Sequence, residues 1–237
     1  MMSKPFEKTD PQQKSQSLLG IIGGMGTQAT ACFYEKLHLM QNVSCEQDYL
    51  DILLYSIPSV PDRTAFITGQ SSDSPLNSLI RAARTLESAG VSHIAIPCVT
   101  SHYFYDDISG AVSIPVINLL RETVDSAIER NVSTVCLFAT DGTIKSRILN
   151  SAFEKRGINI RTPSDSIQAD LMEIIYDIKC GSEISPEVLE PITKQALEDS
   201  TEAVVLGCTE LCIHAKEHPK VINTLDVLAE AALNNFR

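Results

Sequence analysis

The sequence predicts an α/β protein with two similar lobes, each built on a parallel sheet that is flanked by helices. From Leu18 onward, short apolar runs alternate with amphipathic stretches, which is the pattern of parallel strands joined by crossover helices. Most of the short runs are apolar throughout, as expected for strands that are covered on both faces. The two halves of the chain also repeat one order of features at an offset of roughly 110 residues, which indicates two related lobes.

Eight apolar runs are predicted to be strands. In chain order they span residues 18–22, 50–56, 93–97, 116–118, 132–138, 158–161, 203–206 and 221–223. Between them, apolar residues at helical spacing predict amphipathic helices over residues 76–86, 120–128 and 171–178. Asp73-Ser74-Pro75 gives the first of these helices a capped start, and Gly181 ends the third.

Each half opens with a strand and a Gly-Thr loop and closes with a strand and a cysteine. The first half carries Gly26-Thr27 and Cys98-Val99-Thr100, and the second carries Gly142-Thr143 and Cys208-Thr209-Glu210. Open parallel sheets bind ligands at the carboxyl ends of their strands, so we expect a site between two lobes related by a pseudo-two-fold axis.

The repeat also predicts the domain organisation. We assign residues 18–114 together with 212–237 to the first lobe, and residues 115–211 to the second. Residues 1–17 are polar and include two prolines, so we expect them to form a disordered tail.

The charge and cysteine content exclude several classes of partner. The 237-residue chain has 19 Lys and Arg against 30 Asp and Glu, a formal charge of -11, which repels nucleic acids and anionic membranes. No run approaches the roughly 18 apolar residues that a transmembrane helix requires. Seven scattered cysteines, and a polar N-terminal segment without the apolar core of a secretory signal, predict a cytoplasmic protein. A small acidic ligand remains compatible if basic side chains gather locally.

Cys98 and Cys208 are the first candidates for chemistry. Each directly follows an apolar strand and a Pro or Gly, which places its side chain at the mouth of a loop. A free cysteine is often an inert core residue, and we interpret the other five in that way. Two cysteines in corresponding positions of two lobes, however, would face each other across a cleft. Inversion of a carbon centre needs this arrangement, because one thiolate removes a proton while the opposite thiol delivers one.

Several motifs occur in an order that resembles the aspartate/glutamate racemase family. These are Gly23-Gly24-Met25-Gly26, Pro61-Asp62-Arg63-Thr64, Pro97-Cys98-Val99-Thr100-Ser101-His102, Ala139-Thr140-Asp141-Gly142-Thr143, Ile178-Lys179-Cys180-Gly181 and Gly207-Cys208-Thr209-Glu210. The resemblance extends from about Leu18 to the C-terminus and is strongest to aspartate racemases. It implies a cofactor-independent amino-acid racemase, active as a homodimer, with Cys98 and Cys208 as the two bases.

Arg63 and Lys179 carry the argument about the substrate. Most Arg and Lys residues are solvated surface cations, but both of these lie beside predicted cleft loops. The resemblance implies that they hold the side-chain carboxylate of aspartate, Arg63 as a planar fork and Lys179 as a point charge. It also assigns substrate contacts to further motif residues. These are Met25, Asp62, Thr64, Val99, Thr100, Ser101, Thr143 and Thr209.

Val99 departs from the family pattern, which usually has Asn after the first cysteine. The resemblance gives that Asn to the α-carboxylate of the substrate, and a valine side chain cannot form the hydrogen bond. Two alternatives to aspartate racemisation therefore stay open. One is a racemase or isomerase of another acidic substrate such as glutamate, and the other is a catalytically silent carboxylate-binding protein.

Other ligand classes are not supported. Gly23-Gly24-Met25-Gly26 is not G-x-G-x-x-G, and no Gly-Lys-Ser/Thr follows, so nucleotide binding is not expected. No phosphate cradle accompanies a candidate Schiff-base lysine, so pyridoxal phosphate is not expected either. Cys212 and His214 are separated by one residue, which leaves no loop to wrap a zinc ion, and we predict no metal site.

Overall fold

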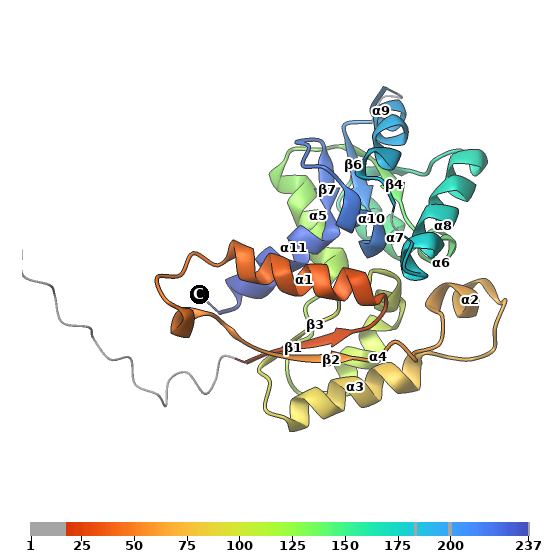
Figure 1. Cartoon of the computed structure of the whole chain (residues 1–237). Helices are drawn as coiled ribbons and strands as arrows, with labels where there is room; N and C mark the ends of the chain where they lie inside the picture. Colours follow the sequence, from red (N-terminus) through yellow and green to blue (C-terminus); the bar gives the residue numbers. More distant parts are fainter. Residues whose placement is uncertain (1–17, 183, 199–200, 237) are drawn as a thin grey trace, which may run out of the picture.

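The computed structural model of the chain describes residues 18–182, 184–198 and 201–236 (Figure 1). The predicted disordered tail, residues 1–17, lies outside the described residues. Within them, the predicted α/β fold is confirmed: two parallel sheets are flanked by helices, with strand orders β2-β1-β3 and β5-β4-β6-β7.

The strands lie close to the predicted ranges. Their bounds are β1 Leu18–Gly23, β2 Asp51–Ser56, β3 His93–Ala95, β4 Thr134–Phe138, β5 Asn159–Arg161, β6 Ala203–Leu206 and β7 Val221–Asn223. Every pairing between them is parallel, so all the carboxyl ends of one sheet meet at one edge.

Helices connect the strands and cover the sheets. Their bounds are α1 Thr27–Met40, α2 Arg63–Thr68, α3 Leu76–Ser88, α4 Tyr105–Gly110, α5 Leu119–Glu129, α6 Asp141–Ser146, α7 Ile148–Glu154, α8 Asp165–Lys179, α9 Glu190–Glu198, α10 Thr209–His214 and α11 Thr224–Asn234, with short 3-10 turns at Glu46–Asp48, Thr100–Phe104 and Pro186–Leu189. None of the helices in the described ranges combines the length and apolarity that crossing a bilayer requires.

Two predicted strands differ from the structure for local reasons. The prediction of a strand over residues 116–118 is wrong, since only Val116 forms a bridge, to Ile94. Asn118 then accepts a hydrogen bond from the backbone of Arg121 at 3.0 Å and caps α5, so the chain turns into a helix. The strand predicted over 132–138 begins two residues later, because the N–H of Val132 bonds back to Ala127 at the end of α5.

The core follows the two sheets, but β2 is less covered than the sequence predicts. β1 is buried along nearly its whole length and β6 is fully buried, as expected for strands between two helical layers. β2 is an edge strand with a mostly exposed pattern, and Leu53 and Leu54 keep 36% and 40% of their surface exposed. An apolar run alone does not distinguish a central strand from an edge strand.

The C-terminal segment contacts both halves of the molecule. Its strand β7 pairs with β6 in the second sheet, although we assigned residues 212–237 to the first lobe. Its helix α11 packs against α1 of the first half and α5 of the second, and Figure 1 shows α1 and α11 lying between the two sheets. The two sheets therefore share a continuous helical layer, which fixes the loops at their carboxyl ends relative to each other.

Candidate active site

Loops from both sheets enclose one small cavity. Its walls come from Met25, Arg63, Thr64, Cys98, Val99 and Thr100 of the first half, and from Thr140, Lys179, Cys208, Thr209 and Glu210 of the second. The loops after β1, β3, β4 and β6 all contribute, as the position of ligand sites in parallel sheets predicts. The cavity volume is about 10 Å³, so the site is closed around the space between the two cysteines.

The two cysteine side chains are buried in this cavity from opposite halves. Cys98 follows Pro97 beyond the end of β3, and Cys208 is the residue before α10. Their exposed fractions are 5% and 3%, and both are free thiols. The hydroxyl of Thr209 donates to the carbonyl oxygen of Pro97 at 3.2 Å, which ties the two cysteine loops together.

Glu210 contacts the second thiol directly. The Cys208 S–H donates to Oε2 of Glu210 at 2.9 Å, and the backbone N–H of Gly26 donates to Oε1 at 2.9 Å. Burial, and after it the charge of Glu210, raise the pKa of the Cys208 thiol well above its ordinary value, although Lys179 works in the opposite direction. Cys208 is therefore a protonated thiol in this arrangement.

The two predicted cations approach the cavity from different helices, and neither is an ordinary surface residue. Arg63 begins α2 and is only 7% exposed; its guanidinium donates to the carbonyls of Val60 and Pro61, while its buried Nε has no hydrogen-bond partner within the described part of the chain. Lys179 ends α8, with its ammonium 3.9 Å from Oδ2 of Asp62.

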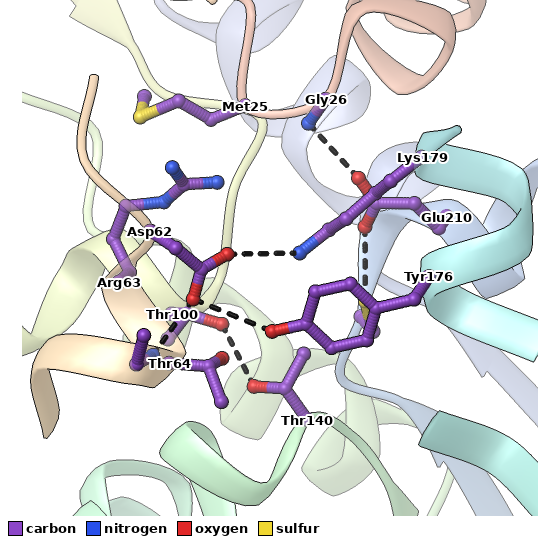
Figure 2. A network of polar contacts seen from close by, with 12 residues as sticks. Met25, Gly26, Asp62, Arg63, Thr64, Thr100, Thr140, Tyr176, Lys179 and Glu210 are labelled. Atoms are coloured by element: carbon purple, nitrogen blue, oxygen red, sulfur yellow. Dashed lines mark hydrogen bonds and ion pairs between the residues drawn. The ribbon is translucent and has the colours of Figure 1, made fainter. Parts of the chain in front are cut away.

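The ammonium of Lys179 is held among acidic and aromatic groups (Figure 2). It lies 4.9 Å from the ring centre of Tyr176, whose hydroxyl donates to Oδ1 of Asp62 at 3.4 Å. Burial opposes its charge, but attraction to Glu210 and Asp62 outweighs burial and raises the pKa of Lys179. The side-chain end of the site thus carries two cations, Arg63 and Lys179, and two carboxylates, Asp62 and Glu210.

Three threonine hydroxyls form a buried cluster opposite these charges. Thr100 Oγ1 lies 3.1 Å from Thr140 Oγ1 and 3.0 Å from Thr143 Oγ1, and the last two are 3.2 Å apart. Thr140 also caps α6 by accepting from the backbone N–H of Thr143. The cluster joins the loop after Cys98 to the loop after β4, and supplies hydroxyl donors beside the buried side chain of Val99.

The structure brings most of the predicted site residues to the cavity and leaves three beside it. Asp62 caps α2 and contacts Lys179 at the rim, Thr143 lies behind Thr100, and the Ser101 hydroxyl donates to the sulfur of Met25 at 3.4 Å. His102 is a buried structural residue that bonds the carbonyl of Cys98 at 3.0 Å.

Sequence reasoning did not select three residues of this site. Thr140 and Glu210 belong to motifs that were recognised, but no role was given to either residue. Tyr176 was missed; its spacing of three residues from Lys179 on a predicted helix is the only signal that places it there.

Two parallel sheets thus place a buried thiol from each half of the molecule in one cavity. The chain belongs to the Asp/Glu/Hydantoin racemase family, whose model matches residues 22–232. The predicted family resemblance is therefore confirmed.

Individual relatives agree with this assignment. The chain is 24% identical to the broad-specificity amino-acid racemase RacX of Bacillus subtilis, over 92% of this chain and 98% of the relative. Among solved structures, the aspartate racemase of Picrophilus torridus superposes with a TM-score of 0.83 at 28% identity, covering 92% of this chain and 94% of the other. A glutamate racemase from Francisella tularensis shares the fold, with a TM-score of 0.67 at 19% identity over 94% of this chain and 81% of the other.

Proposed function

We propose that this protein interconverts L- and D-aspartate by a two-base mechanism that uses Cys98 and Cys208 and no cofactor. The observation that carries the proposal is the cavity in which both thiols lie together with a buried cation, Arg63, and a partly buried one, Lys179. The solved relative with the TM-score of 0.83 is an aspartate racemase, which supports the choice of substrate.

The proposed reaction moves two protons. One cysteine thiolate takes the α-proton, and the electron pair of the broken Cα–H bond is delocalised towards the α-carboxylate. The opposite thiol then gives its proton to the other face of Cα, and its S–H electron pair remains on sulfur. Hydroxyls of the threonine cluster are placed to donate to the α-carboxylate, where negative charge grows in the transition state.

The side-chain carboxylate of aspartate would bind at the charged end of the site. Arg63 supports this role, because its buried Nε–H finds no acceptor among the residues that the structure describes. Lys179 already has the Asp62 carboxylate 3.9 Å away, so a substrate carboxylate competes with Asp62 for it. Entry of the substrate also requires the cavity to widen, since about 10 Å³ is roughly the space of one water molecule.

A second candidate function follows from the same Asp62. The formal charges of two carboxylates and two cations cancel at the side-chain end of the site, so a substrate with an uncharged side chain is also compatible. The broad-specificity amino-acid racemase RacX is similar to this chain over nearly its whole length. Because position 99 is a valine, a third candidate also has to be tested, a carboxylate-binding protein without catalytic activity.

Proton exchange distinguishes the three candidates. Purified protein would be incubated in D2O with each enantiomer of aspartate, glutamate, alanine and lysine, and deuterium at Cα would be followed by NMR. We expect deuterium exchange at Cα, with loss of optical activity, to be fastest for aspartate. Equal rates for all four amino acids would support broad specificity, and binding without any exchange would support the silent binder.

A homodimer is proposed from the family resemblance. Light scattering of the purified protein measures its mass, and a mass of one chain at micromolar concentration would contradict the dimer.

A further inference from the structure

The environment of the two thiols is unequal in a way that the two-base scheme does not require. Cys208 donates its proton to Glu210, whereas the sulfur of Cys98 has no hydrogen-bond partner among the described residues. The two lobes repeat the cysteine but not the carboxylate. The second residue after Cys98 is Thr100, whereas the second residue after Cys208 is Glu210.

The position of Glu210 is fixed from both halves of the molecule. Its side chain is 2% exposed, with one oxygen on the Gly26 N–H of the loop after β1 and the other on Cys208. A Cβ atom at position 26 would lie 2.8 Å from Oε1, so any larger residue there would displace this carboxylate oxygen. The carboxylate therefore cannot swing away from the sulfur without opening the contact between the two halves.

We infer that Glu210 is a positioning residue that keeps Cys208 protonated, so that Cys208 begins a turnover as the acid and Cys98 as the base. The inference rests on the proposed two-thiol function. A thiolate at Cys208 would lie beside a carboxylate 2.9 Å away, and like charges at that separation disfavour ionisation. The Cys208 S–H instead points its proton at Oε2 and keeps the sulfur oriented.

The other charged groups around Cys208 and Glu210 are compatible with this state. The ammonium of Lys179 faces both, and it favours a thiolate at Cys208. Arg63 and Asp62 act on the charge of Lys179, with opposite signs. Burial adds to the effect of Glu210, and the pKa of the Cys208 thiol is raised despite Lys179.

The proton balance of a turnover sets how the inference can be tested. After one inversion, Cys98 holds the α-proton as a thiol and Cys208 is a thiolate, so Cys98 must lose a proton and Cys208 must regain one before the resting state returns. L- and D-amino acids have equal free energy in solution, so kcat/KM is the same in both directions at every pH. Comparing the two enantiomers by kcat/KM therefore cannot reveal the asymmetry, and the protonation of Cys208 has to be measured directly.

A titration of the cysteine Cβ signals provides that measurement. Protein labelled with 13C at cysteine Cβ would be followed by NMR from pH 6 to 11. This range extends about two pH units or more on each side of the pKa of free cysteine. The Cys208 signal would be assigned from its loss in Cys208→Ser. In wild type we expect Cys208 to ionise above the value of free cysteine, about 8.5.

Glu210→Gln is the decisive variant. It keeps the side-chain length and an acceptor for Gly26, but it removes the charge and turns an N–H towards the sulfur. Because both changes favour the thiolate, we expect the Cys208 titration to move down by about one pH unit or more. The optimum of the common kcat/KM profile should move in the same direction.

Matched variants distinguish this effect from a general change of charge. Asp62→Asn also removes a carboxylate near Lys179, but Asp62 makes no hydrogen bond to Cys208, so it should move the titration much less. Glu210→Asp keeps the charge, so Cys208 should ionise at a higher pH in this variant than in Glu210→Gln. If Glu210→Gln does not fold, wild type and Glu210→Asp still test the inference.

Two results would overturn the inference. One is ionisation of Cys208 in wild type at or below the value of free cysteine. The other is an equal shift in Glu210→Gln and Asp62→Asn. The titration needs no substrate, so it remains valid even if the protein racemises nothing, and the exchange experiment above tests the proposed function separately.

Discussion

The hydroxyl of Thr209 donates a hydrogen bond to the carbonyl of Pro97, so the residue after one cysteine of the cavity is bonded to the residue before the other. The two cysteines reach the cavity from different sheets, and nothing in the strand register fixes the distance between them. The buried 3.2 Å hydrogen bond between Thr209 and Pro97 holds the two cysteine loops together locally. A two-base reaction depends on that distance, because both sulfurs have to reach one carbon atom from opposite faces.

Thr209→Val is therefore expected to slow catalysis as well as to destabilise the fold. The substitution keeps the side-chain shape but leaves the Pro97 carbonyl without this donor, a loss of about 1 to 3 kcal/mol. We expect kcat for aspartate to fall by roughly tenfold, with a melting temperature about 2 to 12 °C lower. Thr209→Ser, which keeps the hydroxyl, is the matched control. Full activity in Thr209→Val would show that the hydrogen bond does not matter, and a loss in Thr209→Ser as large as in Thr209→Val would show that the methyl group matters as much as the hydroxyl.

Removal of either active-site cysteine is expected to abolish racemisation. Cys98→Ala and Cys208→Ala each delete one of the two groups that exchange protons at the α-carbon, and each removes only one buried sulfur, at a cost of about 1 kcal/mol of stability. Circular dichroism should therefore show folded variants without racemase activity. Cys212→Ala is the control, because Cys212 is equally buried but bonds Thr224 outside the cavity. Full activity in Cys208→Ala would end the two-base proposal.

Arg63 and Lys179 are expected to control the choice of substrate. Both cations are largely buried, so loss of either from a paired carboxylate site should cost about 2 kcal/mol or more, roughly thirtyfold in kcat/KM for aspartate. Lys194→Ala is a matched control, since Lys194 is an exposed cation in a loose pair with Glu198. Steady-state kinetics with aspartate and alanine make the comparison. Unchanged aspartate kinetics in Arg63→Ala would remove aspartate as the substrate.

The sequence predicts the parts of the site that follow directly from strand ends. Cys98, Cys208 and the loop that carries Thr140 all come after apolar runs that form strands, so their place at one sheet edge follows from parallel topology. The contact between Gly26 and Glu210 is different, because it joins residues 184 positions apart in two different lobes. Such a contact depends on how the sheets pack, and α1 and α11 decide that packing.

The sequence patterns also did not predict the burial of side chains in two places. The apolar run of β2 forms a partly exposed edge, while Arg63, a cation, is almost fully buried. In both cases the neighbours in space determine the outcome, and local composition does not report them. The same limit applies to Tyr176, whose hydroxyl meets Asp62 across 114 positions of sequence.

Val99→Asn tests whether the absent amide limits activity. Val99 is buried against the cavity beside Thr100, so an asparagine of similar volume would place an N–H donor near the hydroxyls of Thr100 and Thr140. If the only defect is one missing hydrogen bond to a charged α-carboxylate, it is worth about 1.5 to 3 kcal/mol. Aspartate racemisation should then rise by roughly ten- to a hundredfold.

Val99→Thr is the matched control for that substitution, because it keeps the branched shape of valine and adds only a hydroxyl. We expect a smaller gain than in Val99→Asn, since the hydroxyl has a shorter reach. The rate of deuterium exchange at Cα measures both variants against wild type. A fast wild type that Val99→Asn slows would show a pocket built around valine, and would favour a less polar substrate than aspartate. Absence of exchange in all three proteins, with an acidic amino acid still bound, would favour a carboxylate-binding protein over an enzyme.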